Sequence, residues 1–247
     1  MRELSINIIT NNNQYGLSND ASILVNNLSV IKNSSKAFNF KVRPVNFYCS
    51  ECGSADINFF LERPNPLLIH SGKINIYVPN VEWCFKVWEQ YLPMFDEIWC
   101  KTRHAENIFN KITSNNDQIV VKYIGWTSID RHSLKHKKKY DECLHVAGKS
   151  IFKGTQSIID NWDITYPTLH LVYNKSNLSF TIPVSLTNIK TYPERLEDDE
   201  LIRLMNTCAI HLCPSEAEGF GHYLNEARSS SSIVITTDAE PMNTFSK

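Results

Sequence analysis

Two glutamates and two glycines lie close together near the end of the chain. Gly219 follows Glu218 directly, Gly221 comes two residues later, and seven residues separate Glu218 from Glu226. The glycines allow a ligand to approach the backbone closely, and a helix that begins near His222 would present free backbone N–H groups there. The carboxylates could accept hydrogen bonds from hydroxyls of the same ligand. The stretch indicates a site for an anionic or hydroxyl-rich ligand; the alternative is a solvated helix start whose acids complement the helix dipole.

Two lysines follow an apolar segment farther upstream. The segment 144–148 predicts a strand that ends at Gly148, and Lys149 and Lys153 come after that end. Two cations beyond a strand end can stabilise the negative charge that develops on a departing phosphate group. The pattern therefore indicates phosphate chemistry at this strand end, and the alternative is a pair of surface lysines.

The seven cysteines predict reduced thiols. Their number is odd and they are scattered from Cys49 to Cys213, which does not fit a disulfide framework. Cys49 and Cys52 form a CxxC pair, but a zinc site would need a second pair of ligands at suitable spacing, and the sequence shows none. We therefore expect a turn with small residues at the CxxC pair, and no metal site.

The elements that would carry these residues predict an α/β fold. Short β-branched segments alternate with helical patterns, which is typical of a mostly parallel sheet. Asp20 is predicted in the first turn of its helix, where a carboxylate suits the helix dipole. In the first half the predicted strands are 6–10, 40–47, 57–60, 74–78, 97–100 and 119–124, and the predicted helices are 19–31, 85–92 and 104–112.

A polar stretch separates this half from a second α/β half. It contains the basic run 131–139, which is predicted to be a solvated linker rather than a contact to phosphates or to a membrane surface. The second half has predicted strands at 144–148, 169–173, 187–192, 210–213 and 233–237, and predicted helices at 156–162 and 197–206. The predicted domains are 1–127 and 143–247, two Rossmann-like units with a cleft between them, joined by a linker at 128–142.

Composition and charge exclude several classes of protein. The 247 residues carry a formal net charge of −1, whereas broad electrostatic binding to nucleic acid needs a basic face. The sequence has no run of about 18 apolar residues that would predict a membrane span. Glu3 stands where a signal peptide would need its apolar segment, so we expect a cytoplasmic protein.

Two stretches resemble one enzyme family. After a predicted strand, residues 214–227 carry Pro-Ser, Glu218, Gly-Phe-Gly and Glu226 in order, and this resembles the E-x7-E signature of retaining GT-B glycosyltransferases of the family 4 type (glycosyl transferases group 1). Residues 145–155 resemble the family's strand, Gly-Arg and Lys-Gly element, with Lys149 at the arginine position and Lys153 at the lysine position. The resemblance is strong over 144–241, although the four serines at 229–232 stand where the family usually has a glycine before an apolar strand.

The resemblance implies a role for each matching residue. Lys149 and Lys153 would hold the donor diphosphate and assist its departure, and Glu218 would position the donor sugar. These three are the catalytic candidates. The donor-binding candidates are Gly16, Gly148, Gly219, Phe220, Gly221, His222 and Glu226, with the backbone N–H groups of Phe220 and Gly221 at the sugar and Glu226 at the ribose hydroxyls.

The first half of the chain resembles the family at its strand ends. Residues 11–16 follow the first predicted strand, where the family has a glycine-bearing loop that faces the donor phosphates and the acceptor; here Gly16 is the one glycine. Glu82 and His104 follow other predicted strands and are candidates for acceptor contacts, because strand ends of a doubly wound sheet border the ligand cleft. The alternatives are a simple turn at Gly16, a helix cap at Glu82 and a surface histidine at His104.

The resemblance implies a glycosyltransferase. It would move a sugar from a nucleotide-sugar donor to a hydroxyl of a glycan, protein or small-molecule acceptor, with retention and without a required metal or other cofactor. The family's C-terminal domain usually continues past the last residue here, so we expect a shortened C-terminal domain. The alternative is a catalytically silent nucleotide-sugar-binding protein or a partner subunit of a split glycosyltransferase. A Rossmann-type dehydrogenase or epimerase would need a GxGxxG motif after the first strand, and residues 11–16 lack it.

Overall fold

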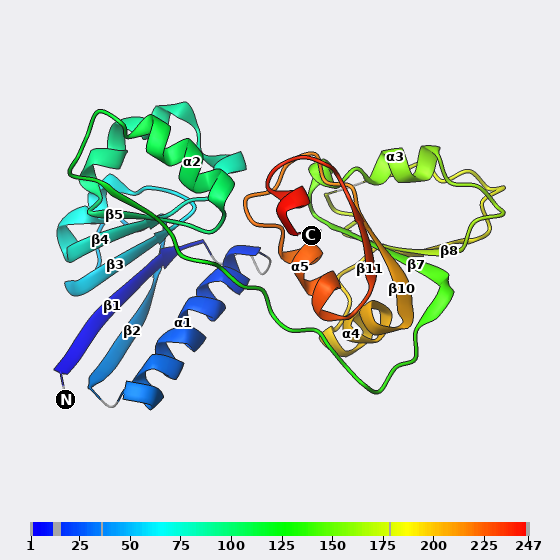
Figure 1. Cartoon of the computed structure of the whole chain (residues 1–247), viewed down its shortest axis with the longest axis horizontal. Helices are drawn as coiled ribbons and strands as arrows, with labels where there is room; N and C mark the ends of the chain where they lie inside the picture. Colours follow the sequence, from blue (N-terminus) through cyan, green and yellow to red (C-terminus); the bar gives the residue numbers. More distant parts are fainter. Residues whose placement is uncertain (1, 12–15, 36, 178, 246–247) are drawn as a thin grey trace. The chain divides into compact units, whose positions relative to one another are not determined.

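The computed structural model describes residues 2–11, 16–35, 37–177 and 179–245 (Figure 1). Contacts within the chain divide it into two compact units, Met1–Ser128 and Ile129–Lys247. Each unit contains one parallel sheet together with helices, so the predicted α/β class is confirmed. Among the described residues, no helix is both long enough and apolar enough to cross a membrane.

A six-stranded parallel sheet forms the centre of the first unit. The strand order is β2-β1-β3-β4-β5-β6, and each neighbouring pair is parallel. Each of the six strands predicted in this half overlaps one observed strand. The strands are β1 (Arg2–Thr10), β2 (Phe38–Asn46), β3 (Ala55–Leu61), β4 (Gly72–Val78), β5 (Glu97–Cys100) and β6 (Val120–Tyr123).

Among its described residues, the first unit has two α-helices and three 3-10 segments. The helices are α1 (Gly16–Ser35) and α2 (Arg103–Ile112), and the 3-10 segments are η1 (Pro66–Ser71), η2 (Val81–Trp83) and η3 (Lys86–Met94). The α-helix predicted over 85–92 is wrong in type, because η3 occupies this position. Pro93 lies inside η3; a proline disfavours the α conformation of the residue before it and lacks the N–H that an α-helix would use.

Both faces of the first sheet are buried. Phe59 packs in one apolar cluster with Ile8 and with Leu24 of α1, whereas Phe60 belongs to the other cluster, with Phe109 of α2. Successive residues of a strand point to opposite faces, so a continuous apolar strand can fill both clusters. The apolar segments of β1, β3 and β4 are therefore interior strands of a sheet covered on both sides, whereas the edge strands β2 and β6 are more exposed.

A five-stranded parallel sheet forms the centre of the second unit. The strand order is β11-β10-β7-β8-β9. The strands are β7 (Lys139–Gly148), β8 (Thr168–Tyr173), β9 (Ile189–Tyr192), β10 (Cys208–Cys213) and β11 (Ile233–Thr236). The helices are α3 (Thr155–Asp160), α4 (Asp198–Thr207) and α5 (His222–Ser229), with 3-10 segments η4 (Ile151–Lys153) and η5 (Met242–Phe245). The predicted strands and helices of this half overlap these elements.

The basic run 131–139, which leads into β7, makes hydrogen bonds within the second unit. The Arg131 backbone N–H donates a hydrogen bond to Ser229 Oγ (2.9 Å), and the Lys138 ammonium donates one to Ser232 Oγ (2.5 Å). The strand β7 begins within the run. Arg131 and Lys138 are thus hydrogen-bonded to the second unit, whereas other residues of the run, such as Leu134 and Lys137, are exposed.

Serines form the turn between α5 and β11. Ser231 has a φ of +59°, a left-handed conformation that residues other than glycine rarely adopt. The Ser230 hydroxyl donates a hydrogen bond to Ala227 O (2.8 Å) and its N–H donates one to Glu226 O (3.1 Å). Side-chain hydroxyls thus close the end of the helix in a turn where the sequence has no glycine.

Candidate functional site

Two loops meet at the carboxyl end of the second sheet. One follows β7 and includes Gly154, and the other follows β10 and includes Pro214. The Glu216 N–H donates a hydrogen bond to Phe152 O (2.8 Å), and a Cβ placed on Gly154 would lie 2.3 Å from Pro214 O. Gly154 has a φ of +67°, so both its conformation and the close approach require glycine. Ligands of open parallel α/β sheets bind at this edge.

The two loops bring together two of the predicted catalytic residues. The Lys153 ammonium forms an ion pair with the Glu218 carboxylate, and Ser215 Oγ donates a hydrogen bond to the same carboxylate (2.6 Å). The Lys153 and Glu218 side chains keep 16% and 13% of their surfaces exposed. They are within reach of a ligand, yet sheltered enough for charges to interact more strongly than in water. Such a pair can bind a ligand that carries both an anionic group and hydroxyls.

His145 supports the site from inside β7. It is completely buried, and burial lowers the pKa of its imidazole to about 4. Its Nδ1 lies 2.7 Å from Leu212 O and its Nε2 lies 2.8 Å from Thr155 Oγ1. A carbonyl oxygen only accepts, so Nδ1 carries the proton and Nε2 accepts from the threonine hydroxyl. The ring therefore joins β7 to β10 and to the start of α3. The sequence analysis assigned it no role, since a histidine between apolar residues is indistinguishable from an ordinary core residue.

Glu226 forms a second ion pair in this unit. It lies in α5 with 6% of its surface exposed, and its Oε2 is 3.4 Å from Arg131 Nε. Burial raises the pKa of Glu226, while the positive charge of Arg131 lowers it. Arg131 also lies 3.8 Å from Asp198. The sequence analysis placed Arg131 in the basic run without a function; its distance of 95 residues from Glu226 in the sequence hid the contact.

The other predicted donor-binding residues of this unit lie at the start of α5 and at the end of β7. Gly221 precedes α5 with a φ of +81°, and Gly148 ends β7 with a φ of +59°. A Cβ placed on Gly148 would meet nothing within 4 Å, so the space beside this residue is open. The burial of the remaining residues varies: Gly219 and Phe220 are buried, His222 is half-buried, and Lys149 is exposed.

The three predicted residues of the first unit also follow strand ends. Glu82 is half-buried in η2, after β4, and His104 is half-buried in the first turn of α2, after β5. Gly16 is the first residue of α1. The rest of its predicted loop, residues 12–15, lies outside the described residues. All three residues stand at the carboxyl edge of the first sheet, where the sequence analysis expected them.

A buried network at this edge was not predicted. Lys101, directly after β5, forms an ion pair with Asp20 (2.5 Å) and donates a hydrogen bond to Asn80 Oδ1 (2.7 Å). Asn80 in turn donates to Glu62 Oε2 (3.0 Å), and Lys101 Nζ lies 5.4 Å from the centre of the Trp126 ring. The helix α1 begins at Gly16, so the prediction that Asp20 serves the helix dipole in the first turn is wrong. Its carboxylate pairs with Lys101, because both are buried and need a partner.

Comparisons with solved structures find glycosyltransferases. The Anabaena protein HepE, solved with UDP and glucose, is 12% identical; the match covers 96% of this chain and 81% of that one, with a TM-score of 0.63. The lipopolysaccharide outer core galactosyltransferase WaaB is 12% identical, with coverage of 97% and 83% and a TM-score of 0.64. A trehalose-6-phosphate synthase is 6% identical, with coverage of 97% and 85% and a TM-score of 0.63.

These likenesses show the fold. The two parallel sheets with their helices form the GT-B architecture, as the sequence analysis predicted. No protein-family model matches the sequence, and no curated protein matches it.

Proposed function

We propose that this protein is a glycosyltransferase that moves a sugar from a nucleotide-sugar donor to an acceptor hydroxyl with retention of configuration. The observation that carries the proposal is the Lys153–Glu218 ion pair at the carboxyl edge of the second sheet. One loop contributes a cation suited to a diphosphate, and the other contributes a carboxylate suited to sugar hydroxyls. The fold supports this reading, because HepE has the same architecture and was solved with UDP and glucose.

A bound donor would separate Lys153 from Glu218 and give each of them a new partner. Its diphosphate would take Lys153 away from Glu218, and Glu218 would then accept hydrogen bonds from the donor sugar. As the glycosidic bond breaks, negative charge grows on the diphosphate, and Lys153 with Lys149 would stabilise it. The backbone N–H groups of Phe220 and Gly221, just before α5, would hold the sugar in place. Orientation and charge stabilisation supply the rate, and no enzyme nucleophile is required.

Glu226 would bind the nucleoside part of the donor. Its carboxylate would accept hydrogen bonds from the ribose hydroxyls, which a charged acceptor does better than a neutral one. Arg131, at 3.4 Å, would keep the carboxylate ionised against the effect of burial. Gly148 borders open space, which would leave room for the nucleotide beside the end of β7.

The acceptor side is assigned to the first unit. Glu82 and His104 would contact the acceptor, which carries the hydroxyl that attacks the sugar and is a glycan, a protein or a small molecule. Gly16 would allow close approach at the start of α1. Lysines supply the positive charge that a metal ion supplies in other transferases, so the proposed reaction is independent of metal and of other cofactors.

A donor screen tests the proposal. Binding and hydrolysis are measured for UDP-, GDP-, ADP- and dTDP-sugars with the unaltered chain, Lys153→Met, Glu226→Gln and the control Lys137→Met, an exposed lysine of the basic run. We expect one donor to turn over, with the activity lost in the first two variants and kept in the control and in the presence of a chelator. NMR of the product anomer would show retention. Donor binding without turnover would point to the silent binder, and no binding to any donor would refute the assignment of this site.

A further inference from the structure

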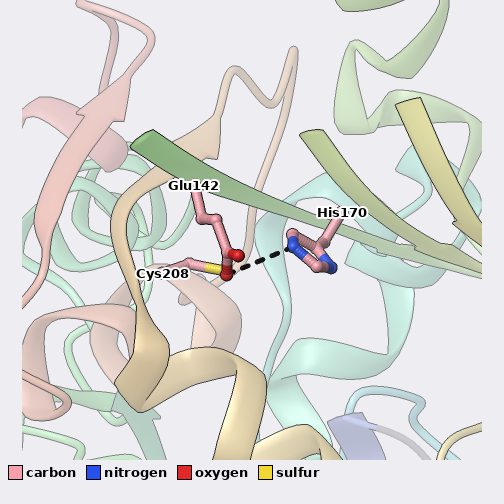
Figure 2. Close-up of side chains that lie close together, drawn as sticks. All are labelled: Glu142, His170 and Cys208. Carbon is pink, nitrogen blue, oxygen red and sulfur yellow. Dashed lines mark ion pairs between the residues drawn. The ribbon is translucent and has the colours of Figure 1, made fainter. Parts of the chain in front are cut away.

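Three potential metal ligands converge at the opposite edge of the second sheet. Glu142, His170 and Cys208 lie near the amino ends of β7, β8 and β10, and one ligand atom from each lies within 4.8 Å of the other two (Figure 2). His170 and Cys208 are buried, and Glu142 is half-buried. The residues are far apart in the sequence, so only the parallel pairing of the strands brings them together.

The distances suit a small tetrahedral ion. Glu142 Oε2 lies 3.4 Å from His170 Nε2. Around zinc, with bonds of about 2.0–2.2 Å to nitrogen and oxygen, a tetrahedral angle separates two such ligand atoms by about 3.3–3.5 Å. The longer zinc–sulfur bond places a thiolate about 3.6 Å from the imidazole nitrogen. The Cys208 sulfur lies within 4.8 Å of both partners, so its distance to each exceeds this geometry by no more than about 1.2 Å.

His170 is oriented as a metal-binding histidine would be. Its Nδ1 lies 2.9 Å from the Tyr192 hydroxyl, and the two rings stack with centroids 5.8 Å apart. Its Nε2 is buried, has no hydrogen-bond partner among the described residues, and faces Glu142. A hydrogen bond on the far nitrogen is the usual way in which a protein orients such a ring.

We propose that Glu142, His170 and Cys208 bind a zinc ion. One thiolate, one imidazole and one carboxylate form a donor set that zinc accepts. The ionised carboxylate and thiolate together would balance the charge of the ion. Lys139 occupies the other carboxylate oxygen of Glu142 at 3.0 Å, which leaves Oε2 for the metal. The Glu142 side chain is 13% exposed, so the ion can enter from this side and a water can complete the tetrahedron.

The site would stabilise the fold and take no part in sugar transfer. Its residues lie near the amino ends of β7 and β10, whereas Lys153 and Glu218 follow the carboxyl ends of the same strands. The ion would link three neighbouring strands of the sheet, β10, β7 and β8. The inference is therefore independent of the proposed function, and either can fail without the other.

Cobalt binding tests the site directly. The titration uses the full chain carrying Cys49→Ser and Cys52→Ser, because the CxxC pair, with Cys49 exposed and Cys52 half-buried, would otherwise compete for the metal. We expect one equivalent of Co²⁺ to produce a thiolate-to-metal charge-transfer band, and Zn²⁺ to displace it. Adding Cys208→Ser should remove the band, whereas Cys213→Ser, a buried cysteine at the other end of β10, should keep it.

Two further variants keep the test independent of any folding defect in Cys208→Ser. His170→Gln should weaken Co²⁺ binding by at least tenfold, and Tyr192→Phe, which removes no ligand, should weaken it about tenfold. Zn²⁺ should raise the unfolding temperature of the unaltered chain by several degrees, because it binds only the folded state. Absence of the band in the Cys49→Ser/Cys52→Ser chain, or its persistence in Cys208→Ser, would overturn the proposal.

Discussion

Each unit carries a lysine–carboxylate pair at the carboxyl edge of its sheet, but the two pairs differ in burial. In the first unit, the Lys101 and Asp20 side chains are each 2% exposed, and Asn80 occupies a further hydrogen-bonding position of the ammonium. In the second unit, Lys153 and Glu218 keep 16% and 13% of their side-chain surfaces exposed. Each pair joins a lysine that follows a strand end to a carboxylate, aspartate in the first unit and glutamate in the second.

The difference indicates two roles for one chemical pair. A completely buried ion pair cannot release a partner to a ligand without leaving an uncompensated charge in the interior. A partly exposed pair can exchange one partner for a ligand that carries the same charge. Lys101–Asp20 therefore holds the start of α1 against the end of β5, and Lys153–Glu218 is the pair available for binding.

The largest effect is expected when the buried pair is broken. Lys101→Met should destabilise the first unit by about 3–5 kcal/mol, because Asp20 is left buried without a partner. Urea unfolding followed by hydrogen exchange resolved by unit measures this effect. The double variant Lys101→Met/Asp20→Leu should recover most of the loss, since it removes both charges. A single variant as stable as the unaltered chain would show that the pair is hydrated, and the contrast in burial would no longer explain the two roles.

A loss of activity with little loss of stability is expected from the partly exposed pair Lys153–Glu218. Lys153→Met should lower turnover of the donor about 10²–10³-fold, because one stabilising charge is removed from the leaving diphosphate. Its unfolding free energy should change by less than about 1 kcal/mol, since the ion pair is partly solvated. Steady-state kinetics and urea unfolding of the same preparation provide both values. Equal losses of stability in Lys153→Met and Lys101→Met would contradict the comparison.

The second unit should also be the more sensitive to acid. His145 and His211 are completely buried there, whereas His70 of the first unit is exposed and His104 half-buried. Burial lowers the pKa values of His145 and His211 to about 4. Both rings are neutral in the folded chain but take up protons in the unfolded chain below about pH 6.5, so unfolding binds protons and stability falls as the pH drops from 6.5 towards 4.

Between pH 7 and pH 5, each of these two histidines is expected to lower the free energy of unfolding by roughly 1–2 kcal/mol. Hydrogen exchange at the two pH values, resolved by unit, checks it. His145→Gln should reduce the pH dependence of the second unit and leave that of the first unchanged. An equal pH dependence in the two units would rule out the buried histidines as its cause.

The smallest effect is expected at Arg131. Arg131→Met removes the charge that lowers the pKa of Glu226, so this pKa should rise further. Donor binding needs the ionised carboxylate. As the pH is lowered, the affinity of Arg131→Met for the donor should therefore begin to fall at a higher pH than the affinity of the unaltered chain. At neutral pH we expect the donor affinity to fall about tenfold, or about 1.4 kcal/mol, which is typical of a weakened charged hydrogen bond. Calorimetric measurement of donor affinity at several pH values checks this shift. If the affinity of the variant falls at the same acidic pH as that of the unaltered chain, Arg131 does not act through Glu226.

Local patterns predicted much of the fold. The alternating apolar segments identified the strands, and Lys153 and Glu218, which the resemblance assigns to one donor, form an ion pair. The same reasoning missed Arg131 and misassigned Asp20, because their partners lie 95 and 81 residues away in the sequence. It also gave no sign that Glu142, His170 and Cys208 lie together, because these residues come from three different strands.

By itself, the sequence determined which segments are strands, where glycine is needed, and which charged residues follow strand ends, because periodicity and backbone preference are local properties. Only the tertiary structure decided which charges pair and how deeply they are buried. These depend on the order of the strands in each sheet, which brings together side chains with no relation in sequence. Burial then sets the strength of each interaction, and so separates the structural pair of Lys101 and Asp20 from the exchangeable pair of Lys153 and Glu218.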